Sequence, residues 1–159
     1  MATTRSAPRW PRGFLLCSTA AALAFLALPT VRSLGPYSDS FGTLFGGNFS
    51  SQGTGFVLLP VLAVIFAFAF ASMLREVTLL RIMTGLVAIA GGSACLFLAL
   101  GVRRSANMIG VLQGPGFASA YGIDLLIGAL ALVCASGVLV LLPLKRRHAN
   151  VPNSWSGEF

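Results

Sequence analysis

The chain has 159 residues, of which 56% are hydrophobic and only 9% are charged, and its mean hydropathy is +0.86. A soluble domain carries about a quarter of its residues charged, so this composition excludes an ordinary water-soluble domain and indicates an integral membrane protein. The formal net charge of +7 does not indicate nucleic-acid binding, because the basic residues flank the apolar runs.

Four apolar runs of about 20 residues predict four transmembrane helices, since a helix rising ~1.5 Å per residue then crosses a hydrocarbon core of ~30 Å. The runs cover 13–31, 55–74, 82–102 and 123–144. The fold class is therefore all-α, a single four-helix transmembrane domain over 1–144 with short Gly-rich outer loops. Residues 145–159 are predicted to be a basic, flexible cytoplasmic tail.

The first run follows a basic leader, as in a signal peptide. Its apolar core at 13–31 is longer than the usual ~7–15 residues of a signal peptide, so we expect a retained helix. In the four-span arrangement Arg32, Arg103 and Arg104 fall on one side. The other side carries Arg5, Arg9, Arg12, Arg75, Arg81, Lys145, Arg146 and Arg147. This asymmetry predicts that both termini are cytoplasmic.

Two short sequences recur in the same order. FLALPTVRS at 25–33 is matched by FLALGVRRS at 97–105, and QGTGF at 52–56 by QGPGF at 113–117. A duplicated antiparallel hairpin, giving a parallel repeat about the membrane normal, would place each pair at equivalent positions. The abundance of Leu, Ala, Phe and Gly can also produce the recurrence, so both explanations stay open. The glycines are expected to turn the chain into the next helix.

The first outer loop and the tail supply candidate contacts to lipid or to a partner protein. These are Tyr37, Phe41, Phe45 and Phe49, and Trp155 in the tail. The loop aromatics are four residues apart, which suits one face of a helix. Glycines between them oppose a helix, so an irregular loop or a short hairpin is the alternative. The loop aromatics could equally pack on their own helix ends.

Small residues in the third and fourth spans predict close helix packing within the four-helix bundle. The pairs are Ala88/Gly92 and Ala90/Ala94, with a stripe of Gly128, Ala131 and Ala135.

Asp124 is the one acid within a predicted span. It stands in the first turn of the fourth helix, where the helix dipole favours a carboxylate. Arg103 and Arg104 lie at the same level, so we expect a structural ion pair, with an ion or proton pathway as the alternative.

The residue types needed for catalysis are sparse. The four acids Asp39, Glu76, Asp124 and Glu158 are scattered, and His148 is the only histidine. Cys17, Cys95 and Cys134 form no metal-ligand or redox spacing. We therefore expect no catalytic residues, no metal and no cofactor, and no enzyme activity.

An Ala/Leu-rich four-span chain with a G-x-G-F sequence before a Gly/Ala-rich last helix and a basic tail resembles small uncharacterised membrane proteins of actinobacteria. The resemblance implies an accessory subunit of a large envelope assembly, such as an MCE-type lipid transporter, in a bacterial inner (plasma) membrane. We expect a non-catalytic accessory or scaffolding subunit whose partners are a larger membrane complex and membrane lipids, with no nucleic acid. The alternative is a small homo-oligomeric channel or carrier that uses Asp124.

Overall fold

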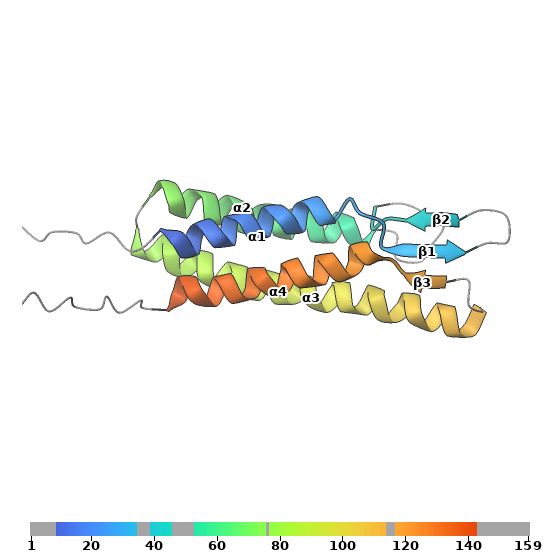
Figure 1. Cartoon of the computed structure of the whole chain (residues 1–159). Helices are drawn as coiled ribbons and strands as arrows, with labels where there is room; N and C mark the ends of the chain where they lie inside the picture. Colours follow the sequence, from blue (N-terminus) through green and yellow to red (C-terminus); the bar gives the residue numbers. More distant parts are fainter. Residues whose placement is uncertain (1–8, 35–38, 46–52, 76, 114–116, 143–159) are drawn as a thin grey trace, which may run out of the picture.

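A computed structural model describes residues 9–34, 39–45, 53–75, 77–113 and 117–142. Four helices run alternately up and down in a bundle, and three short strands lie beyond one end of it (Figure 1). The elements are α1 (Trp10–Phe25), β1 (Val31–Leu34), β2 (Asp39–Gly42), α2 (Thr54–Leu74), α3 (Thr78–Gln113), β3 (Phe117–Ser119) and α4 (Tyr121–Leu141). We call the end that carries the strands the sheet end, and the opposite end, where α2 turns into α3, the turn end.

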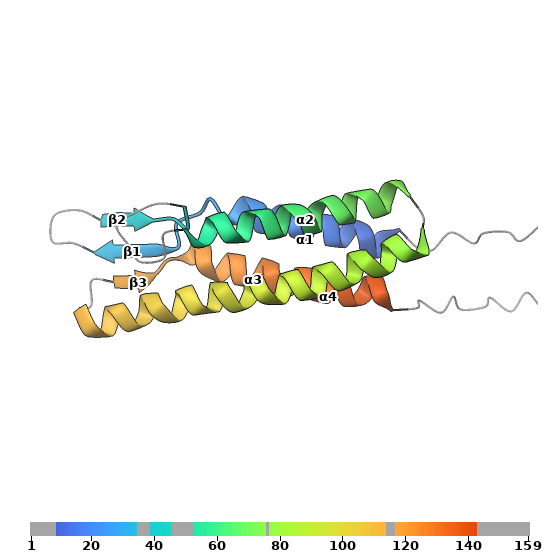
Figure 2. The same cartoon turned by 180° about the vertical axis from the view of Figure 1, so that it is seen from behind.

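Each helix packs against its neighbours in chain order, and α1 closes the ring against α4. The view from behind shows the same order, with α2 and α3 in front and α4 behind them (Figure 2). The most extensive packing is between α3 and α4. The predicted antiparallel hairpins, α1 with α2 and α3 with α4, are therefore present.

Three of the helices are long and apolar enough to cross a membrane. They cover Thr54–Leu74, Thr78–Met108 and Tyr121–Leu141, and their most apolar 18-residue stretches have mean hydropathies of 2.6, 2.1 and 2.4. α1 has 16 residues, fewer than the ~20 that span a hydrocarbon core as a helix. The finding supports a helical membrane protein with three span-length helices.

A proline explains why α1 is shorter than its apolar run. The last turn tightens, with Ala27 N donating to Ala24 O at 3.2 Å and Leu28 N to Phe25 O at 3.1 Å. Pro29 has no N–H to continue the ladder, and the chain becomes extended in β1. Gly101 occupies the matching place in the second FLAL sequence, where α3 continues to Gln113. The two FLAL sequences therefore adopt different structures.

The two loops at the sheet end are joined in one antiparallel sheet with the order β2-β1-β3. β1 and β2 form a hairpin within the first loop, with Arg32 opposite Phe41. β3 comes from the second loop and pairs with the other edge of β1, with Arg32 opposite Ala118. The short hairpin considered as an alternative for the first loop is therefore present. The all-α prediction missed β3 and the pairing of the two loops, because strands of three or four residues leave almost no periodic signal.

The two QGxGF sequences are also not equivalent. Gly53 precedes α2 with φ of 96°, a left-handed conformation that favours glycine. In the second copy, Gln113 ends α3 and Phe117 begins β3, while 114–116 lie outside the described residues. The predicted glycine turn into a helix is thus found at the first copy.

A different correspondence links α2 and α4. Both have 21 residues, and each carries a buried glycine at its second position. Gly55 N donates to Leu44 O at 3.0 Å, and Gly122 N donates to Pro29 O at 3.2 Å. Each glycine lets a helix start directly against the backbone of the first loop. This similarity is structural and leaves the question of duplication open.

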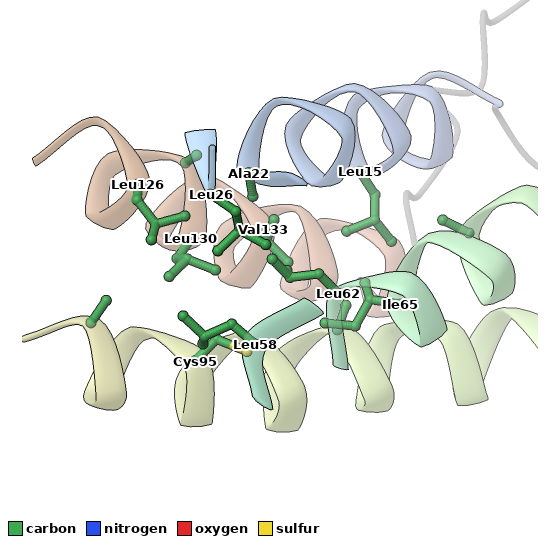
Figure 3. Close-up of a cluster of buried hydrophobic side chains, with 14 of the residues drawn as sticks. Leu15, Ala22, Leu26, Leu58, Leu62, Ile65, Cys95, Leu126, Leu130 and Val133 are labelled. Carbon is green, nitrogen blue, oxygen red and sulfur yellow. The ribbon is translucent and has the colours of Figure 1, made fainter. Parts of the chain in front are cut away.

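Apolar side chains from all four helices fill the bundle. In Figure 3, Leu58, Leu62 and Ile65 of α2 point toward Leu15 and Ala22 of α1 and toward the side chains of α4. The buried residues include Leu15, Ala22, Leu58, Leu62, Ile65, Ala88, Cys95, Leu126, Leu130 and Val133. Because lipid is as apolar as this interior, close packing rather than transfer from water holds the helices together.

Two arginines close the turn end of the bundle. Arg12 Nη1 donates to Ser72 O at 2.7 Å, and Arg81 donates from Nε to Val140 O at 2.7 Å and from Nη2 to Leu142 O at 2.8 Å. Helix-terminal carbonyls have no partner in their own helix, and cations are favoured there. In each hairpin, an arginine near the start of one helix thus caps the end of the other.

Candidate functional site

The predicted ion pair forms at the sheet end. Arg103 Nε lies 3.2 Å from Asp124 Oδ1, and the two side chains are 46% and 50% exposed. Asp124 is in the first turn of α4, so the carboxylate also meets the positive end of the helix dipole. The candidate Arg104 is exposed on α3, and the structure gives it no ion pair among the described residues.

Arg81 and Arg103 contact opposite ends of α4 from the same helix. Arg81 binds the last carbonyls of α4, and Arg103 binds the acid in its first turn. The rise from one arginine to the other is about 33 Å at ~1.5 Å per residue, close to the ~30 Å of a hydrocarbon core. The two arginines therefore stand at the levels expected for the two membrane boundaries.

A pocket lies on α3 at the level of the ion pair. Leu100, Arg103, Arg104, Asn107 and Met108 line a cavity of about 510 Å³. These residues recur at spacings of three and four, so they share one face of the helix. Beyond Arg103 the helix continues to Gln113 alongside β3 (Figure 1). The pocket combines an apolar wall with a guanidinium group that Asp124 does not neutralise.

A second cavity of about 380 Å³ lies between α2 and α3. Its walls are apolar, from Val61, Val64, Val87 and Ala90, with Pro60 and Gly91. The groove offers no group that would orient a polar ligand, and acyl chains fill such surfaces in a membrane.

Of the candidate aromatic contacts, Phe45 packs on the bundle. Its ring meets Phe56 edge-on, with centroids 5.5 Å apart. Phe45 is partly buried against the core, which corresponds to the alternative that loop aromatics pack on their own helix ends. Phe41 lies in β2. Tyr37, Phe49 and Trp155 lie outside the described residues, and their contact roles stay predictions.

Some of the predicted small residues are buried in helix contacts, and the others are exposed on the outside of the bundle. Gly92 packs so closely on α4 that a Cβ there would lie 2.9 Å from Cys134 Sγ, and Ala88 is also buried, as predicted. Gly85 and Gly137, which the sequence analysis missed, make a second close approach. The remaining predicted small residues Ala90, Ala94, Gly128, Ala131 and Ala135 are exposed, so their assignment to packing within the bundle is wrong.

The described residues contain no group of three or more His, Cys, Asp or Glu side chains that could hold a metal ion. Buried hydroxyls in the described bundle bond to helix carbonyls or to one another. Thr84 Oγ1 reaches Phe68 O on α2 at 3.2 Å, and Ser18 lies 3.4 Å from Ser136 on α4. These groups cross-link helices, which leaves the α3 pocket as the candidate site.

We expect Asp124→Asn to change the stability of the bundle by less than about 1 kcal/mol. Both partners are half exposed, and ion pairs of this kind contribute ~0–1 kcal/mol. Thermal unfolding in detergent micelles measures the effect. A loss of several kcal/mol would show that the pair has a larger structural role than its exposure indicates.

Comparison with protein-family models, with curated proteins and with solved structures gives no match, so the residues themselves carry the functional argument.

Proposed function

We propose that the protein is a non-catalytic accessory or scaffolding subunit of a larger membrane complex, which it contacts through a structured body outside the bilayer. We call this body the outer head. It consists of β1, β2, β3 and residues 103–113 of α3. A lipid-transport system of a bacterial envelope is the assembly that the resemblance suggests.

The proposed topology has four crossings with both chain ends in the cytoplasm. α1 is short as a helix, but it lies beside α2 and α4 within the bundle (Figure 1). Residues 26–30 continue past the end of α1 as a turn and an extended segment, so the first apolar run reaches further than the helix itself. Leu26 within this segment is buried. The start of α1 and the end of α4 lie at the turn end, where Arg12, Arg75 and Arg81 agree with a cytoplasmic side.

The outer head is the observation that carries the proposal. Two loops far apart in sequence pair in one sheet, and α3 runs about 15 Å past Arg103 at ~1.5 Å per residue. A structured surface of this kind is typical of recognition, because its backbone is already ordered before a partner binds. The exposed stripe Gly128, Ala131 and Ala135 on α4 gives further support, because small residues allow a helix of another protein to approach closely.

The interior of the bundle supports an assembly role better than a pore. Leu58, Leu62, Leu126 and Leu130 are fully buried in its centre. A hydrophilic path requires polar groups along the way. Asp124 faces Arg103 at the end of the bundle, away from this interior.

Photocrosslinking in native membranes tests the proposal. A photoreactive residue at Ser105, exposed on the outer head, should give an adduct of one reproducible mass above the 16.6 kDa of the chain. The matched position is Thr78, exposed at the turn end of the same helix, which should not give that adduct.

The mass of the adduct separates the alternatives. A partner of different mass, seen only from Ser105, supports the assembly subunit. An adduct of twice the chain mass alone indicates a homo-oligomer and contradicts the proposal. Equal adducts from both positions would show that the outer head does not select the partner.

A further inference from the structure

The α3 pocket has an excess of positive charge. Arg103 and Arg104 both line it, and among the described residues Asp124 forms an ion pair with Arg103 alone. Arg104 forms no hydrogen bond or ion pair with the part of the chain that the structure describes. The chemistry of the pocket therefore suits an anion with several oxygen acceptors, because guanidinium groups bind phosphate through parallel N–H bonds.

The position of the pocket along α3, relative to the expected membrane boundary, indicates the source of this anion. Leu100 lies one turn below Arg104, toward the bundle, and Met108 lies one turn beyond it. The pocket extends about 12 Å along the helix axis at ~1.5 Å per residue. Because Arg103 stands at the expected boundary, the pocket covers the top of the hydrocarbon and the adjoining headgroup layer, which is ~5–7 Å thick.

We infer that this pocket binds the phosphate group of an anionic glycerophospholipid in the membrane leaflet at the sheet end. Arg104 donates to the phosphate oxygens, and Asn107 is placed one turn further out to bond a headgroup hydroxyl. Leu100 contacts the upper part of an acyl chain. The space of about 510 Å³ is an open depression on one face of α3, which a lipid lying beside the helix can enter from the side.

Free phosphate would satisfy Arg104 but would leave the apolar wall without a ligand. A lipid satisfies both, since its charged headgroup would lie at the level of Arg104 and its acyl chain at the level of Leu100. This inference is independent of the proposed partner complex, because it concerns a ligand supplied by the bilayer itself.

Native mass spectrometry of the full chain in micelles tests the inference by titration with phosphatidylglycerol. We expect Arg104→Gln to weaken phosphatidylglycerol binding at least about tenfold, as for loss of a charge-assisted hydrogen bond. Arg75→Gln removes another exposed arginine, at the turn end, and should leave binding unchanged. Circular dichroism melting verifies that both variants keep the fold.

Three results would overturn the inference. Equal weakening by both variants would show a general charge effect. Phosphatidylcholine binding as tightly as phosphatidylglycerol would show that net lipid charge plays no part. Competition by inorganic phosphate at millimolar concentration would assign the site to a soluble anion. Selective loss in Arg104→Gln, without such competition, supports the lipid site.

Discussion

Replacing Gly122 by alanine is expected to destabilise the bundle by about 2–4 kcal/mol, in the range of severe overpacking. A Cβ at this position would overlap the carbonyl oxygen of Pro29 and lie 2.9 Å from the Cβ of Leu28. Neither atom belongs to the end of a flexible side chain. Relief would require α4 to move away from the first loop, with loss of the hydrogen bond from Gly122 N to Pro29 O.

The same helix provides the matched control. Nothing lies within 4 Å of a Cβ built on Gly128, so Gly128→Ala should gain up to about 1 kcal/mol from helix propensity. Thermal unfolding of both variants in one detergent measures the contrast. If Gly122→Ala were as stable as Gly128→Ala, the close start of α4 against the loop would not be a constraint on the fold.

Arg12→Met is expected to cost about 2 kcal/mol, the typical penalty for leaving a buried acceptor without its donor. Arg12 is only 4% exposed, and Nη1 reaches Ser72 O at 2.7 Å. Ser72 is in the last turn of α2, where carbonyls lack partners within the helix. Methionine keeps most of the apolar stem, so the variant isolates the hydrogen bond.

Arg75→Met is the control for this prediction, because Arg75 is exposed next to the end of α2. Its stability should stay within about 0.5 kcal/mol of the parent. Thermal unfolding again measures the difference, and hydrogen exchange in the last turn of α2 should accelerate in Arg12→Met. Equal stability of the two variants would mean that water or lipid headgroups replace the guanidinium group without loss.

The apolar runs predicted α2 and α4 well, because in these helices the membrane-crossing length and the helix length coincide. α2 was expected at 55–74 and is found at Thr54–Leu74. α3 was expected at 82–102 but extends from Thr78 to Gln113. Hydropathy detects only the apolar part of a helix, and α3 continues past Arg103 through a more polar stretch that gives no such signal.

In the candidate site, the sequence predicted only the contact between opposite charges. Asp124 and Arg103 were expected to pair because opposite charges at one membrane level attract. The caps made by Arg12 and Arg81 were missed, since their acceptors are backbone carbonyls about sixty residues away. The outward-facing Gly128 stripe was misassigned because composition alone does not show which face of a helix meets the bundle.

Because β1 is the central strand, the sheet of the outer head can be completed only late in the synthesis of the chain. β1 and β2 emerge early from the ribosome, but the second neighbour of β1 is β3, which follows α3. The three-stranded sheet can therefore close only after the chain has been made past Ser119 and α3 has been inserted. A protein that recognises the closed sheet would thus distinguish a finished bundle from a half-inserted chain.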